Sequence, residues 1–377
     1  MRDRVAQWLR ASPVSVALAL VLLTVYLASA FRAGVVWEIP ADALLRDGAS
    51  YGPALAAGEW WRVVSAAFLH GGALHLLVNL VVLADAAPLV EAGGATADRP
   101  PPLLTRLRRV IGVFIVTAAG GFVASAWWSS GAVSIGASGG ILGFYGYWLA
   151  RVWRMAGQRA DQPRRFGPVL ARRHVALAAG YLAAAVTAGF LIPGVDNAAH
   201  IGGLLGGAVL GWMPTANARA STAVAQLVLV SAALLAMPAQ WAADYRAQQH
   251  FNEIYSRFVE RDRQANAEIR RLLGEIRAGR DPAAVAGEFD RLVAGRLREN
   301  RQLWLDQSAD DGSSALAIER QRWQRYGDLR VDAAESLVAA LLAPDGATQA
   351  RELGRFERAM REARAIAEEA NSALDKP

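Results

Sequence analysis

The sequence contains no cysteine among its 377 residues. Disulfide bonds, thiol catalysis and cysteine-based metal sites are therefore excluded. Lysine is almost as scarce, because Lys376 is the only one and arginine carries nearly all of the positive charge. The net charge of +6 lies mostly in loops between apolar segments rather than in one basic region, so no nucleic-acid partner is indicated.

Charged residues are scarce up to about Trp241, where long apolar runs follow one another. A bilayer core requires about 20 apolar residues per helix, and about 17 still suffice. We expect the first run to be a retained span rather than a signal peptide, because it is longer than a signal-peptide core. The sequence therefore predicts an all-α polytopic membrane protein. Seven transmembrane helices are expected, at residues 13–31, 71–90, 110–128, 136–153, 174–193, 197–213 and 222–240.

The change from apolar to charged sequence divides the chain into regions. We expect a cytoplasmic N-terminus at residues 1–12, a six-helix transmembrane core at 13–213, a seventh transmembrane helix at 222–240 and a helical C-terminal domain at 244–377. In the last region apolar residues recur at three- and four-residue spacings, which is typical of soluble helices, and Trp304 and Trp323 are candidate anchors of a small core. A domain that contacts a protein partner or the membrane face, and charged helices without a partner, both remain open.

Arginine predicts the orientation. It is concentrated before the first predicted span and in the loops after the second and the fourth, while the alternate loops are poor in it. The positive-inside rule then places the N-terminus in the cytoplasm. The second, fourth and sixth spans begin on the outer side, and a seventh span would put the C-terminal domain outside the cytoplasm.

Histidine is the third scarce residue, with five in the chain. Polar groups inside spans are costly and face the bundle interior, so each one is a functional hypothesis. His75 and Asn79 lie four residues apart and share one face of the second predicted helix. Ser138 lies in the first turn of the fourth, and His200 in the first turn of the sixth. The predicted orientation puts all four in one leaflet at similar depth.

These residue types permit acyl transfer. A neutral histidine activates a serine hydroxyl by removing its proton, and donors are needed for the oxyanion that then forms. The Ser138 backbone N–H at a helix start is such a donor, and His75 and Asn79 add side-chain donors. No Asp or Glu is placed to orient His200, so a Ser–His dyad is expected.

Other interpretations are weaker. A lone serine in a glycine-rich membrane helix is usually a packing residue, so the prediction rests on the four polar residues together. His70, His75 and His200 have no carboxylate beside them, so no metal is expected, and no motif implies a cofactor. A transporter would need charged residues deep in its spans, where Asp85 stands alone.

The order of motifs resembles the rhomboid family of intramembrane serine proteases. Over residues 58–213 the chain carries Trp61 and Arg62, then FLHGGALHLLVN, GASGGILG and AHIGGLLGG. The resemblance implies a six-helix core with Ser138 as nucleophile, His200 as base, and an oxyanion hole of His75, Asn79 and the Ser138 N–H. It gives supporting roles to His70, Trp61, Arg62, Gly136, Gly139, Gly203 and Gly207, with Gly203 and Gly207 packing the sixth span on the fourth.

Two features depart from the family pattern. Leu142 occupies a position where many members carry an aromatic residue, and the core is followed by a seventh span and a long tail. The resemblance implies an endopeptidase that cleaves in or near transmembrane helices of single-span proteins in the lipid bilayer, with the bacterial plasma (inner) membrane as its location. The alternative is a catalytically silent rhomboid-fold protein that binds the transmembrane helices of client proteins.

Overall fold

The computed structural model describes residues 12–92, 101–158, 168–192, 195–305 and 314–374. The chain divides into two compact units, residues 1–242 and 243–377, near the point where the sequence changes from apolar to charged. The predicted N-terminal region at 1–12 lies outside the described residues except for Ser12.

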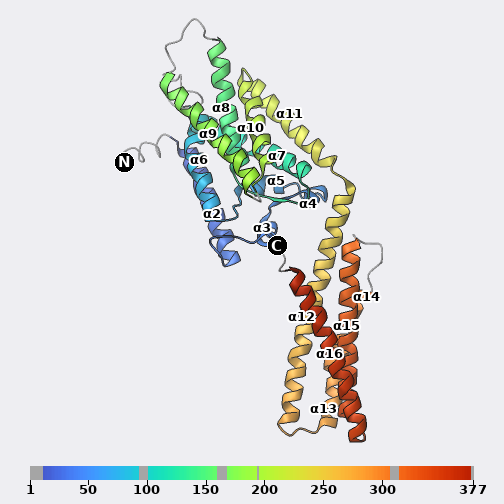
Figure 1. Ribbon diagram of the computed structural model, residues 1–377. Helices are drawn as coiled ribbons and strands as arrows, with labels where there is room; N and C mark the ends of the chain where they lie inside the picture. The colour runs from blue at the N-terminus through green and yellow to red at the C-terminus, as the bar shows by residue number, and fades with distance from the viewer. Residues whose placement is uncertain (1–11, 93–100, 159–167, 193–194, 306–313, 375–377) are drawn as a thin grey trace. The chain divides into compact units, whose positions relative to one another are not determined.

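The first unit is helical, as predicted (Figure 1). Its long helices are α2 (Pro13–Ala33), α6 (Ala73–Ala92), α7 (Leu103–Trp128), α8 (Ser138–Gln158), α9 (Pro168–Leu191), α10 (Asn197–Trp212) and α11 (Ala216–Leu235). Between α2 and α6 lie the short elements α3 (Ala41–Asp47), β1 (Ser50–Tyr51), α4 (Gly52–Ala56), α5 (Arg62–Ser65) and η1 (Ala66–Phe68). The strand β2 (Val133–Ser134) pairs antiparallel with β1, with Ser50 opposite Ser134.

Four of the described helices, α2, α6, α7 and α11, are long and apolar enough to cross a membrane. The chain is therefore a multi-pass integral membrane protein. Helix α10 has only 16 residues, and α8 carries Arg151 and Arg154 near its end, so neither is recognisable as a span by length and composition. Helix α11 (Ala216–Leu235) covers most of the predicted range 222–240, but it starts earlier, at Ala216. It also ends earlier, because the chain leaves the helix at Ala236 and Pro238 precedes a new helix.

Helices α8 and α10 are in backbone contact along a row of glycines. A Cβ atom added to Gly203 would lie 2.1 Å from the Gly139 carbonyl oxygen, and one added to Gly207 would lie 2.0 Å from that of Gly143. One turn further, a Cβ on Gly211 would lie 2.1 Å from the Tyr147 carbonyl oxygen. Only glycine permits this separation, and small residues at such spacing are how helices approach closely in lipid.

A buried carboxylate holds together three helices at their ends. Glu91 of α6 is 1% exposed. One of its oxygens accepts from the Ser15 N–H at 2.8 Å and the Ser15 hydroxyl at 2.6 Å, and the other accepts from the Val14 N–H at 3.1 Å and from Arg106 of α7. The first N–H groups of α2 have no partner within the helix, so Glu91 caps α2 while Arg106 balances its charge.

Replacing Glu91 by Gln is expected to lower the free energy of unfolding by about 1.5–3 kcal/mol, because a charged hydrogen-bond partner is lost in a buried site. Unfolding in detergent micelles measures the loss. The control is Asp42→Asn, since Asp42 pairs with Arg46 on the surface, where the two side chains are 68% and 69% exposed, and this loss should stay within about 0.5 kcal/mol. Equal losses would contradict the role given to Glu91.

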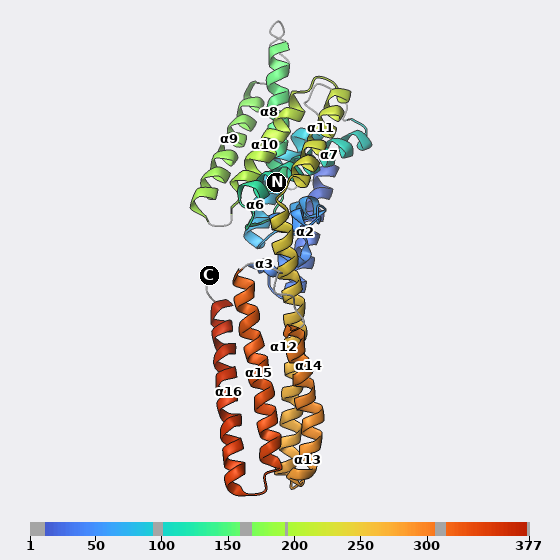
Figure 2. The same cartoon turned by 90° about the vertical axis from the view of Figure 1, so that its right-hand side faces the viewer.

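The second unit is a bundle of long helices (Figure 2). It contains α13 (Pro282–Phe289), the π-helical η2 (Asp290–Ala294), α14 (Gly295–Leu305), α15 (Ser314–Leu341) and α16 (Gly346–Leu374), and α12 (Ala239–Arg277) enters it from the first unit. Trp304 and Trp323 are buried and pack against Phe258, with ring centroids 5.7 and 6.1 Å away. The prediction that these tryptophans anchor a core is confirmed.

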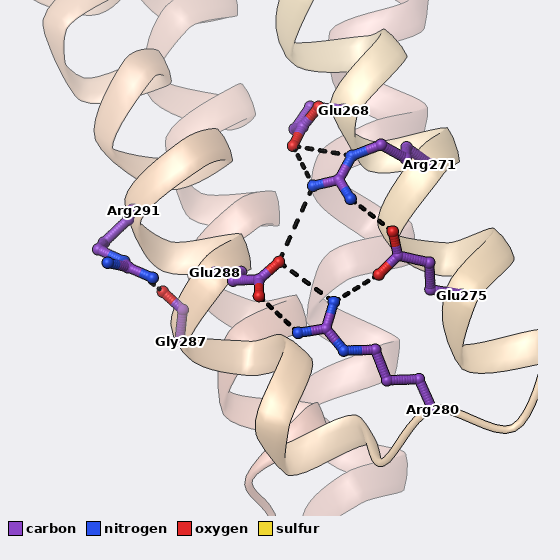
Figure 3. Close-up of polar contacts among 7 residues, drawn as sticks. All are labelled: Glu268, Arg271, Glu275, Arg280, Gly287, Glu288 and Arg291. Atoms are coloured by element: carbon purple, nitrogen blue, oxygen red, sulfur yellow. Dashed lines mark hydrogen bonds and ion pairs between the residues drawn. The ribbon is translucent and has the colours of Figure 1, made fainter.

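Polar contacts reinforce this bundle. Arg280 donates to Glu275 and Glu288, which joins the end of α12 to α13 (Figure 3). The hydrogen bond from Arg280 holds the pKa of the Glu288 carboxyl below its usual range. Within the bundle, Arg330 is 3% exposed and donates to Asp262 at 2.8 Å, so a buried ion pair joins α15 to α12.

Candidate active site

Ser138 is the first residue of α8, and the segment before it has a fixed conformation. Gly136 has φ of +115°, in the left-handed region where side chains are disfavoured. Its N–H donates to the Ala66 carbonyl at 2.9 Å, and the Ala137 carbonyl accepts from the Ile141 N–H at 2.9 Å. The first N–H groups of a helix have no partner within it, so the Ser138 hydroxyl lies beside main-chain donors.

His200 lies in the first turn of α10 and is 7% exposed. Its Nε2 atom is 2.8 Å from Ser138 Oγ, a hydrogen-bonding distance. When the hydroxyl donates and Nε2 accepts, the imidazole is placed to remove the serine proton. Among the described residues, no partner hydrogen-bonds to the buried Nδ1 of His200. The pair therefore has the geometry of a dyad.

His75 and Asn79 have different surroundings, although both lie on α6. A Cβ on Gly136 would lie 2.9 Å from His75 Nε2 and 3.8 Å from Ser138 Oγ, so the imidazole and the serine hydroxyl border the same glycine. Asn79 is 4% exposed, and its amide nitrogen donates to the His75 carbonyl at 2.9 Å. That bond uses one amide hydrogen for the backbone of α6, and the amide has a second. His75 and Ser138 thus border Gly136 together, and Asn79 supports the helix that carries His75.

His70, Trp61 and Arg62 lie in the segment that precedes α6. His70 is fully buried, with its ring 5.1 Å from that of His75. The guanidinium of Arg62 donates to Glu59 at 2.7 Å and to the carbonyls of Leu45 and Ala49 at 2.7 and 3.0 Å. It also lies 4.8 Å from the Trp61 ring. Arg62 thus ties together the chain between α3 and α5 and does not contact the dyad.

Leu142 and Asp85, which the sequence also singled out, have surroundings that require no catalytic or transport role. Leu142 is buried, 3% exposed, in the core of the first unit. The carboxylate of Asp85 accepts from the Tyr145 hydroxyl at 2.7 Å, which links α6 to α8. A partner within the helix bundle accounts for Asp85 without a transport role. In the part of the chain that the structure describes, no group of three or more His, Asp or Glu side chains is close enough to hold a metal.

One residue beside the site was not singled out from the sequence. Asp196 precedes α10 and accepts from the Ala199 N–H at 2.9 Å through Oδ1 and from the Ser134 hydroxyl at 2.5 Å through Oδ2. An aspartate just before a predicted helix is an N-cap signal, so the first contact was predictable. The second was not, because Ser134 lies 62 positions away in the sequence.

Comparison with known proteins relates one region of the chain to one family. Residues 57–217 match the rhomboid domain. RHOMBOID-like protein 4 of Arabidopsis thaliana is 30% identical over 159 residues, covering 41% of this chain and 34% of that protein. The rhomboid protease GluP of Bacillus subtilis is 28% identical over 197 residues, covering 51% of this chain and 34% of that protein. The putative rhomboid protease YdcA of the same bacterium is 28% identical over 166 residues, covering 43% of this chain and 71% of that protein.

The match accounts for only part of several of these relatives. Among the plant relatives, the matched region spans 34% of RHOMBOID-like protein 4 and 44% of the mitochondrial RHOMBOID-like protein 6. The matched residues contain Ser138, His200, His75 and Asn79, and they end before the second unit begins.

Proposed function

Because the chain belongs to the rhomboid family through residues 57–217, we propose that it is an intramembrane serine endopeptidase that uses Ser138 and His200. It hydrolyses peptide bonds in or near the transmembrane helices of other membrane proteins. The observation that supports this most is the 2.8 Å separation of His200 Nε2 and Ser138 Oγ, both of which belong to the matched domain. Nucleophile and base within hydrogen-bond reach are what acyl transfer requires.

The reaction proceeds in two steps. The Ser138 oxygen attacks the carbonyl carbon of the substrate while His200 takes the hydroxyl proton. The C–N bond then breaks, His200 returns the proton to the leaving amine, and an acyl-serine ester remains. In the second step His200 takes a proton from water, the hydroxide attacks the ester, and Ser138 regains its proton as the acid leaves.

Each step passes through a tetrahedral oxyanion that needs fixed donors. The Ser138 N–H at the start of α8 is one donor, supported by the positive end of the helix dipole. His75 is the second, because its Nε2 lies next to Gly136, which the Ser138 hydroxyl also borders. Asn79 contributes through its remaining amide hydrogen and by holding His75 through the bond to the His75 carbonyl.

The site sets requirements for the substrate. A transmembrane helix satisfies its own carbonyls, so the scissile bond becomes accessible only where the helix unwinds. Small and helix-weakening residues such as Gly or Pro near the cut favour that unwinding. Single-span membrane proteins are the substrate class, and helix α9 is the proposed edge of lateral entry.

We place the protein in the bacterial plasma membrane, and the arginine distribution favours a cytoplasmic N-terminus with the second unit on the outer side. Its buried aromatic core and ion pair are those of a folded soluble bundle, which fits a module that binds a protein partner. Protease digestion of the second unit in intact cells, with and without membrane disruption, tests the side it occupies.

Cleavage by the purified protein tests the function itself. The protein is reconstituted in liposomes with a single-span substrate that carries Gly and Pro in its outer half, and two fragments are expected. Co-purification of the uncut substrate without fragments would favour the alternative of a catalytically silent helix-binding protein.

Replacing Asn79 by Ala is expected to lower the cleavage rate by about 10-fold to 10²-fold, at or below the usual value of one oxyanion donor. The reason is that the main-chain donor and His75 remain in place. Initial rates at saturating substrate measure the loss. A loss as large as that caused by removal of the nucleophile, together with a lower unfolding midpoint, would show that Asn79 is needed for folding instead.

A further inference from the structure

Asp196 connects the helix that carries His200 to the segment that carries Ser138. Its Oδ1 atom accepts from the Ala199 N–H at 2.9 Å, which caps α10, and its Oδ2 atom accepts from the Ser134 hydroxyl at 2.5 Å. The two carboxylate oxygens therefore bind two different segments. We call the bond to Ser134 the Asp196–Ser134 clamp.

Ser134 is a fixed point because the backbone around it is held from two sides. It pairs with Ser50 in the β1–β2 ladder. Two residues further, the Gly136 N–H donates to the Ala66 carbonyl at 2.9 Å. Ser138 follows after two more residues, so a group attached to Ser134 is attached close to the nucleophile.

The position of the base needs such an attachment. When a third side chain orients a catalytic histidine, it bonds to the ring nitrogen that faces away from the nucleophile. Among the described residues, no group bonds to Nδ1 of His200 in this way. The ring must then be positioned mainly by the first turn of α10, whose His200 N–H donates to the Asp196 carbonyl at 3.2 Å.

The glycine contacts between α8 and α10 do not by themselves fix the position of His200. Contacts such as that between Gly203 and Gly139 set how closely α8 and α10 approach. A smooth row of glycines offers little resistance to sliding or rotation of one helix along the other. A hydrogen bond from a side chain of one segment to a side chain of the other resists both movements.

We propose that Asp196 is a positioning residue for the proposed hydrolysis, acting through the Asp196–Ser134 clamp to hold His200 opposite Ser138. The inference rests on the proposed function of the same site. It goes beyond a helix cap, because capping occupies only Oδ1. Thr215 offers the comparison, since its hydroxyl caps α11 by accepting from the Ala218 N–H at 3.0 Å.

The decisive variant is Ser134→Ala, which removes the clamp and leaves the cap of α10 intact. We expect kcat to fall about 10-fold with KM unchanged, because a displacement of the base by a fraction of an ångström weakens catalysis and not substrate binding. Ser134→Thr keeps the hydroxyl and should restore most of kcat. Thr215→Ala, the matched loss of a cap elsewhere, should leave kcat within twofold.

Asp196→Ala removes both contacts and is expected to lower kcat more than Ser134→Ala. Adding Ser134→Ala to it should have no further effect, because the clamp is already absent. If Asp196→Ala does not fold, the Ser134 variants decide alone.

Wild-type cleavage is measured first, and its absence would refute the proposed function rather than the clamp. If the wild-type protein cleaves the substrate and Ser134→Ala has an unchanged kcat, the role of the clamp is refuted, whereas the proposed function is not.

Discussion

Replacing Ser138 by Ala is expected to lower the cleavage rate of a model transmembrane substrate by at least about 10⁴-fold. The loss is large because the reaction then lacks the atom that forms the acyl intermediate, and His200 has no hydroxyl proton to take. The folded structure should be unaffected, since alanine is smaller than serine and fits the start of α8. Initial cleavage rates and the thermal unfolding midpoint, both measured in the same detergent, separate the two effects.

Ser125→Ala is the matched control for this experiment. Ser125 is 4% exposed and lies in α7 of the same unit, so its replacement removes another buried hydroxyl. Its cleavage rate should stay close to that of the wild type. A Ser138→Ala protein that still cuts at a comparable rate would show that the nucleophile is wrongly assigned.

Replacing Gly207 by Ala has the second largest expected effect. The added Cβ would lie 2.0 Å from the Gly143 carbonyl oxygen and 2.8 Å from its Cα, so α8 and α10 must separate. Because the contact is between backbones, no side-chain rotation relieves it. The separation moves His200 away from Ser138, and we expect cleavage to fall about 10²-fold, as for a misplacement of about 1 Å. The unfolding midpoint should fall as well.

Gly206→Ala tests whether the effect belongs to the contact or to the loss of a glycine. A Cβ on Gly206 would have its nearest neighbour, a Thr117 methyl group, at 3.7 Å, which is an ordinary van der Waals distance. Alanine also favours the helix over glycine by about 1 kcal/mol. Cleavage by Gly206→Ala should stay within twofold of the wild type. Equal losses in the two variants would contradict the backbone-contact account.

Much of the helical fold is predictable from the sequence because lipid imposes a simple rule on it. A span needs a long apolar run, and the helices α2, α6 and α7 lie where the runs predict them. The ends are less predictable. Helix α7 begins at Leu103, before its apolar part, because arginines at a helix end are tolerated where the helix leaves the membrane.

The candidate site is partly predictable for the same reason. Successive spans begin on alternate sides of the membrane, and this alone put Ser138, His200 and His75 at one depth. The structure brings these three residues to one region. Side-chain partners far apart in the sequence were not predictable. The carboxylate of Glu91 gives no sign in the sequence of being buried against Ser15, and Asp196 gives none of its bond to Ser134.

The measurement that tests the central claim most directly is labelling by a serine-directed fluorophosphonate probe, which reacts only with an activated serine. The account predicts that wild type is labelled at Ser138, that Ser138→Ala is not labelled, and that His200→Ala is labelled far more slowly. Peptide mapping of the labelled protein identifies the site. Equal labelling of wild type and Ser138→Ala, or equal rates for wild type and His200→Ala, would contradict the Ser138–His200 dyad.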